Sequence, residues 1–158
     1  MSTDNELKKA WLMRYLYAKR RKNEADDELD QLCAVGSRAI TYSDMPQGSP
    51  DLNGLETIAI AADRQLEELR AATAECQKTR DEVRRAINKL PETESVVMFY
   101  RYTCYQQTDY ERKHKREGTR QLTWQEIANK TNYSIHNVWR IHGAALAHLQ
   151  IPKDYNAR

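Results

Sequence analysis

The chain has 158 residues, with 25 Lys and Arg against 23 Asp and Glu and a formal net charge of +2. Hydrophobic residues make up 40% and charged residues 30% of it, a balance that excludes both a fully disordered chain and one large apolar core. No uninterrupted apolar run is longer than residues 58–62, and this is far shorter than the ~20 residues that a membrane helix needs, so no membrane partner is expected. The N-terminus lacks an apolar signal core and the three cysteines form no CxxC pair, which predicts a cytoplasmic protein with reduced thiols.

Charge is unevenly distributed along the chain. Residues 1–36 carry 7 basic and 7 acidic groups, residues 37–90 carry 8 and 9, and residues 91–158 carry 10 and 7. The last segment therefore has a net charge of +3, and it also holds all four histidines. An anionic partner is expected to bind this last third of the chain.

A first long helix is predicted from Asp4 to about Leu32, because large apolar residues recur there at helical spacing without Gly or Pro. Four consecutive cations at 19–22 are followed by five acids between 24 and 30. This pattern favours a solvated helix face with intrahelical ion pairs over a phosphate-binding patch. The segment 34–54 then holds three of the five glycines and two of the four prolines, which predicts a loop.

A second long helix is predicted over residues 55–90, where apolar residues follow a heptad pattern. A helix of this length cannot bury its stripe on itself, so it must pack against the first helix, a second copy, or both. We expect residues 1–90 to form an antiparallel hairpin that also mediates homo-oligomerisation, with a dimer favoured. Cys76 is expected to be a small core residue. The residues assigned to the oligomer contact are Leu55, Leu66, Leu69, Val83 and Ile87.

Residues 91–149 carry the signals of a helix-turn-helix module. Pro91 restarts a helix that ends near Tyr102, and residues 150–158 form a tail. Thr123 and Glu126 form a capping box at the start of a short helix. Asn132 tolerates the left-handed conformation of a tight turn, and Ser134 then caps the next helix, which runs to about residue 149.

The second helix of the module is expected to enter the DNA major groove. Its core side carries Val138, Ala145 and His142, the last being a structural histidine and not a metal ligand. Side chains near the start of such a helix reach base edges, where Arg suits guanine and Asn suits adenine. The candidate DNA-binding residues here are Ser134, Ile135, His136, Asn137, Trp139, Arg140 and Gly143.

An insertion at 103–121 holds the densest run of cations in the chain. Two interpretations are open, phosphate contacts beside the groove and a solvated loop. The cations assigned to DNA binding are Arg112, Lys113, Lys115, Arg116 and Arg120.

These residues resemble region four of bacterial sigma factors. The likeness runs from Leu90-Pro91 to Arg101-Tyr102 and then from Thr123 to Leu149. Within it, Val138-Trp139-Arg140-Ile141-His142-Gly143 looks like small phage-encoded sigma-like regulators, in the neighbourhood of the ArpU and RinA late-gene activators. An uncharacterised phage family is similar to the upstream helices and loop as well. The resemblance implies a phage or prophage protein of the bacterial cytoplasm that binds DNA and regulates transcription. Contact with bacterial RNA polymerase is left open by the sequence.

The sequence therefore predicts an all-α protein, a helical hairpin followed by a helix-turn-helix, that acts as a DNA-binding transcription regulator on double-stranded DNA. Two alternatives stay open: a small terminase-like packaging subunit and an adaptor that binds RNA polymerase or another phage protein. No catalytic, phosphate-loop or metal-ligand spacing occurs in the sequence, so we expect neither an enzyme nor a cofactor.

Overall fold

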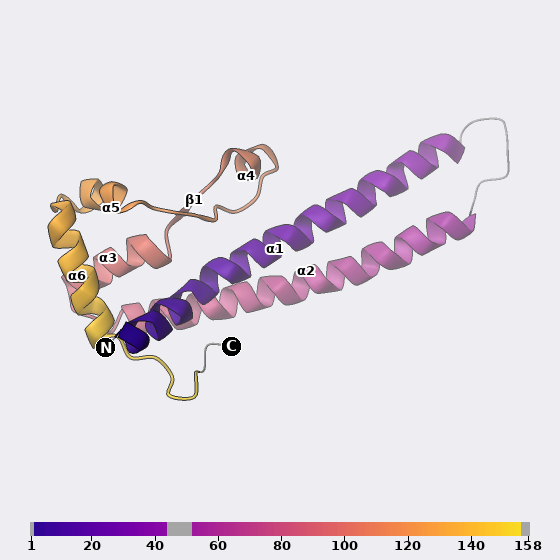
Figure 1. The fold of residues 1–158 in the computed structure, drawn as a ribbon. Helices are drawn as coiled ribbons and strands as arrows, with labels where there is room; N and C mark the ends of the chain where they lie inside the picture. Colours follow the sequence, from indigo (N-terminus) through magenta and orange to yellow (C-terminus); the bar gives the residue numbers. More distant parts are fainter. Residues whose placement is uncertain (1, 44–51, 156–158) are drawn as a thin grey trace.

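The computed structural model describes residues 2–43 and 52–155 (Figure 1). Helices α1 (Ser2–Ser43) and α2 (Leu52–Ile87) form a long hairpin. The shorter elements that follow are α3 (Glu92–Tyr102), β1 (Tyr105–Gln106), α4 (Asp109–Lys113), β2 (Arg120–Gln121), α5 (Trp124–Thr131) and α6 (Ile135–His148). The predicted all-helical class, a hairpin followed by shorter C-terminal helices, is confirmed. Among the described residues, no helix is both long and apolar enough to cross a membrane.

The first helix is longer than the sequence predicts. Helix α1 continues through Gly36 to Ser43 and α2 begins at Leu52, so the predicted loop over 34–54 is wrong at both of its ends. Residues 44–51 lie outside the described residues. A helical glycine costs about 1 kcal/mol. The long contact between α1 and α2 opposes this cost, and Gly36 lies beside Ile58 within it.

The predicted heptad of α2 is confirmed in the second half of the helix, where Cys76 and Val83 are buried. It differs from the buried stripe at two other positions. Gln65 and Thr79 are buried, whereas their neighbours Leu66 and Arg80 are only partly buried. Both polar side chains are hydrogen-bonded. Gln65 Nε2 donates across to the Ala25 carbonyl of α1 at 3.2 Å, and the Thr79 hydroxyl lies within hydrogen-bond distance of two backbone carbonyls of its own helix. Apolar side chains of α2 are thereby left half exposed.

The hairpin and the C-terminal helices share one hydrophobic core. Leu12 of α1, Leu90, Met98 of α3 and Leu146 of α6 belong to the same buried cluster. A second cluster lies between α3, α5 and α6 and includes Val97, Leu122, Ile127 and Val138. The division predicted between residues 90 and 91 is therefore not a break in packing.

The 103–121 insertion is a folded excursion made of β1, α4 and β2. The strands are antiparallel, with Tyr105 opposite Gln121. Glu111 holds the excursion together, because it accepts from the backbone N–H groups of Thr108 at 2.9 Å and Thr119 at 3.0 Å and from the Thr119 hydroxyl. Burial opposes ionisation of Glu111, but these hydrogen bonds prevail and lower its pKa.

Ion pairs fasten this excursion to α1. Glu117 lies 2.8 Å from Lys22 Nζ and 3.9 Å from Lys19 Nζ, and Arg116 binds Asp27 at 2.8 Å and also Asp30. The charges of α1 were predicted to form intrahelical pairs. That prediction is wrong for these residues, because their partners come from a segment about ninety residues away in the sequence.

Candidate nucleic-acid interface

Helices α5 and α6 form a helix-turn-helix with the predicted capping residues. Thr123 Oγ1 accepts from Glu126 N at 3.2 Å and Glu126 accepts from Thr123 N at 2.7 Å, which completes the capping box. Asn132 ends α5 in the left-handed conformation, with φ of 56°. Ser134 then accepts from Asn137 N at 3.2 Å and caps α6. All three sequence predictions about this turn are confirmed.

The inner side of α6 is packed as its periodicity predicts. Val138 and Ala145 are fully buried. His142 Nε2 lies 2.9 Å from the Tyr102 hydroxyl, and the imidazole packs against the Trp124 ring. Burial lowers the pKa of His142 to about 4, with a smaller effect from Lys9 and Arg101, so the ring is neutral at pH 7. The predicted structural role of this histidine is confirmed, and its ring is not exposed to a partner.

The outer side of α6 presents the predicted binding residues to solvent. Ser134, His136, Arg140 and Gly143 are exposed, and Trp139 is 46% exposed. Ile135 and Asn137 are half-buried at the first turn. The helix has no acidic residue, so no carboxylate of its own neutralises Arg140. The outer side thus presents a cation, polar groups and an aromatic ring to solvent.

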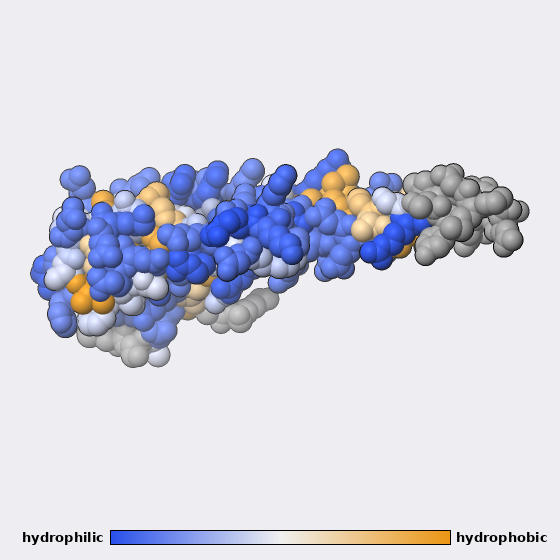
Figure 2. All heavy atoms as spheres, turned by 90° about the horizontal axis from the view of Figure 1, so that it is seen from above, coloured by the Kyte–Doolittle hydropathy of each residue, from blue (hydrophilic) through white to orange (hydrophobic). Residues whose placement is uncertain are grey.

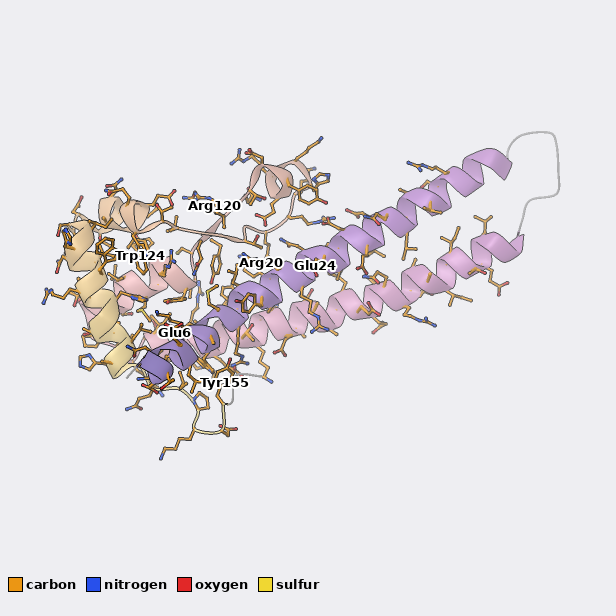
Figure 3. The ribbon with its side chains drawn as sticks, viewed as in Figure 1. Glu6, Arg20, Glu24, Arg120, Trp124 and Tyr155 are labelled. Carbon is orange, nitrogen blue, oxygen red and sulfur yellow. The ribbon has the colours of Figure 1, made fainter. Side chains whose placement is uncertain are left out.

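Arg120 does not extend this surface as a free cation. Figure 3 shows it on the strand β2 that leads into α5, and its guanidinium donates to Glu126 at 2.9 Å and also to Gln106. The hydrogen bonds from Arg120 and then from Thr123 lower the pKa of Glu126 to about 2. Arg120 therefore stabilises the capping box of α5, and its assignment as a phosphate contact stays a prediction.

Arg116 is likewise engaged within the chain. Its side chain is 11% exposed and is held by Asp27 and Asp30 of α1, so it anchors the excursion and is not free for a phosphate. Arg112, Lys113 and Lys115 remain exposed on α4 and just after it. Arg112 has only a loose pair with Asp109, at 3.4 Å. Figure 1 shows α4 well apart from α6, so the two regions could contact only separate parts of one long partner.

Two of the residues assigned to an oligomer contact lie inside the chain's own core. Val83 is 0% and Ile87 is 1% exposed, because both pack where the hairpin meets the C-terminal helices. This corrects their assignment. Leu55, Leu66 and Leu69 are only half-buried. Val35 and Ile60 are exposed on the same half of the hairpin, and Figure 2 shows hydrophobic residues grouped towards this end, with further groups at the opposite end of the molecule.

A contact that sequence reasoning missed ties α6 to the hairpin. Lys8 Nζ donates to the Leu146 carbonyl at 2.8 Å and lies 3.5 Å from the Ala147 carbonyl. These carbonyls belong to the last turn of α6. Carbonyl groups in the last turn of a helix have no N–H partner further along the helix. The two residues lie 138 positions apart in the sequence, and no local pattern signals such a pair.

Among the described residues, no group of three or more His, Cys, Asp or Glu side chains is placed to hold a metal ion. No family model, no curated protein and no solved structure matches this chain. The module and its exposed side chains are therefore the basis for assigning a function.

Proposed function

We propose that this protein is a DNA-binding transcription regulator, of phage or prophage origin, that places α6 in the major groove of double-stranded DNA. The observation that carries the proposal is the outer side of α6. Arg140, His136 and Trp139 are exposed on a helix whose opposite side is fully packed. Helix-turn-helix proteins use this arrangement, with the start of the second helix facing base edges and the first helix crossing the phosphate backbone.

The hairpin supports this role in two ways. It packs against α6 through a shared core and through the Lys8 contact. These contacts hold the proposed recognition helix in a fixed position. Its half-buried leucines Leu55, Leu66 and Leu69 are suited to a second copy, and dimeric helix-turn-helix proteins bind paired half-sites. We propose a dimer formed along this side of α2.

The exposed cations Arg112, Lys113 and Lys115 supply a second, sequence-independent contact in this proposal. The excursion that carries them is fastened to α1 by Arg116 and Glu117. Cations held in a fixed place near the duplex release counterions when they meet phosphates, and this strengthens binding at low salt.

The test is selection of binding sites from a pool of random duplexes, followed by binding measurements on the enriched duplex. Arg140→Ala is expected to weaken binding about tenfold or more, because one good base contact contributes about 1–3 kcal/mol. The control is Arg70→Ala on α2, which removes an exposed arginine that pairs with Glu67. Failure of the wild-type protein to bind any duplex at moderate salt would reject the proposal and favour a protein-binding adaptor.

A further inference from the structure

Arg140 and Asn137 are joined on the outer side of α6. Arg140 Nη2 donates to Asn137 Oδ1 at 2.8 Å. A guanidinium has only donors, so the Asn137 amide must present its oxygen to Arg140. The chemistry thereby fixes the orientation of the Asn137 amide, which is otherwise ambiguous between its oxygen and its nitrogen.

This orientation conflicts with the base that the sequence assigns to Asn137. An asparagine that reads adenine donates to N7 and accepts from the N6 amino group, so it needs its oxygen directed at the base. In the structure that oxygen is directed at Arg140. Asn137 is also half-buried, whereas Arg140 is exposed.

Arg140 keeps what a guanine contact requires. One N–H of its guanidinium is used by Asn137, and a guanidinium has five. The remaining donors match the two acceptors, N7 and O6, that guanine presents in the major groove. At 100° per residue, Arg140 lies within about 40° of both His136 and Ala147 and about 60° from Gly143 around the helix, and all of these residues are exposed.

The other flank of Arg140 offers no comparable partner. His136 and Trp139 are engaged with each other edge to face, with ring centroids 5.4 Å apart. Helix α6 has no carboxylate, so among its described contacts the Asn137 oxygen is the group that orients the guanidinium. Holding a long side chain in place before binding reduces the entropy lost on binding.

We propose that Arg140 reads a guanine in the major groove and that Asn137 is the positioning residue for Arg140, not an adenine reader. The inference rests on the proposed DNA-binding function and adds a base to it. It assigns the base specificity of the first two turns of α6 to Arg140, whose side chain is oriented by Asn137.

The experiment selects sites from a duplex library with a randomised segment of two helical turns, using four proteins in parallel: wild type, Arg140→Lys, Asn137→Ala and Asn137→Asp. The wild type is expected to enrich a guanine at one position of the site. Arg140→Lys should reduce that preference roughly fivefold or more, since a lysine cannot form the bidentate contact. Asn137→Ala should weaken the preference for the same guanine and change no adenine position.

Asn137→Asp separates positioning from direct reading. Aspartate still offers an oxygen to Arg140 but has no N–H for adenine N7, so the guanine preference should be kept even where the added negative charge lowers total affinity. Loss of an adenine position in both Asn137 variants, with guanine unchanged, would overturn the inference. Thermal unfolding of each variant checks that the module stays folded.

Failure of the inference and failure of the proposed function give different results. A wild-type protein that enriches no sequence contradicts both. A wild-type protein that enriches a site whose base preferences survive Arg140→Lys contradicts the inference alone and leaves DNA binding in place. Arg70→Lys serves as the matched control and should leave every position unchanged.

Discussion

Lys8 Nζ lies 2.8 Å from the carbonyl oxygen of Leu146, and this contact joins the start of α1 to the end of α6. A cation at a helix C-terminus satisfies carbonyls that have no intrahelical partner and interacts favourably with the helix dipole. Lys8 is 9% exposed, and its only ion-pair partner among the described residues is Asp4. The contact therefore couples the position of α6 to α1.

Replacing Lys8 by methionine is expected to lower the free energy of unfolding by about 1.5–3 kcal/mol. The substitution keeps the apolar stem but removes a charged hydrogen bond and leaves buried carbonyls unsatisfied. Lys9→Met is the matched control, since Lys9 is more exposed and pairs with the exposed Glu6 of its own helix, and it should change stability by less than about 0.5 kcal/mol. Urea unfolding followed by circular dichroism measures both. Equal effects of the two variants would contradict the capping role.

The buried His142 makes stability depend on pH. Its folded pKa of about 4 lies below the unfolded value near 6.5, so below pH 6.5 the unfolded chain binds a proton that the folded chain does not. Stability is therefore full above about pH 6.5 and falls as the pH drops toward 4, by about 2 kcal/mol between pH 7 and pH 5.

The variant His142→Gln should remove most of that slope, because glutamine can still bind the Tyr102 hydroxyl but does not titrate. His136→Gln makes the same change at an exposed histidine and should keep the slope. Unfolding free energies at several pH values between 5 and 7 measure it. An unchanged slope in His142→Gln would show that another group titrates.

The exposed cations of the excursion should contribute to DNA binding through salt dependence. Changing Arg112, Lys113 and Lys115 together to glutamine is expected to make the slope of log K against log salt shallower by about 2 to 3, since each phosphate contact adds about 0.9. The control changes three exposed cations of α2, Arg64, Arg70 and Lys78, to glutamine. The same slope in both variants would mean that the excursion does not contact phosphates.

The half-buried leucines of α2 should hold a dimer together. Changing Leu66 and Leu69 together to lysine places charge on the proposed contact, and the sedimentation mass is expected to fall from dimer to monomer while helical content is retained. Glu67→Lys, at an exposed position between them, should leave the mass unchanged. A wild-type protein that sediments as a monomer at all concentrations would contradict the proposed dimer, and a ring-shaped assembly would favour a packaging subunit.

What the sequence predicted well is local, and what it missed is long-range. The capping box at Thr123, the left-handed Asn132 and the cap at Ser134 depend on residues three or four positions apart, and each was predicted. The partners of Arg116 and Lys8 lie 89 and 138 positions away. From the local charge pattern, the charged residues of α1 were predicted to pair within the helix. A local pattern contains no information about which distant segment folds against α1.

Two buried positions of α2, Gln65 and Thr79, were missed for a related reason. A heptad pattern assigns burial to apolar residues, whereas Gln65 and Thr79 are buried with their donor groups hydrogen-bonded to backbone carbonyls. The extension of α1 past Gly36 was missed because a glycine is read as a helix end, although one glycine costs less than a long packed interface gains.

Two glycines in the C-terminal half should respond to alanine in opposite ways. A Cβ at Gly118 would lie 2.5 Å from the carbonyl carbon of Gln106, whereas a Cβ at Gly143 would meet nothing within 4 Å. Gly118→Ala is therefore expected to cost about 1–3 kcal/mol through overpacking, and Gly143→Ala to add up to about 1 kcal/mol through helix propensity.

Gly143 is thus a glycine that the fold does not require. A glycine at this position allows a partner to approach the backbone of α6 closely. Gly143→Leu should accordingly leave the fold intact but weaken binding to the selected duplex more than Gly143→Ala does, and Ala74→Leu on an exposed side of α2 should weaken it not at all. Melting temperatures and binding constants for the four variants measure both effects. Undiminished binding by Gly143→Leu would mean that the DNA does not reach this turn of the helix.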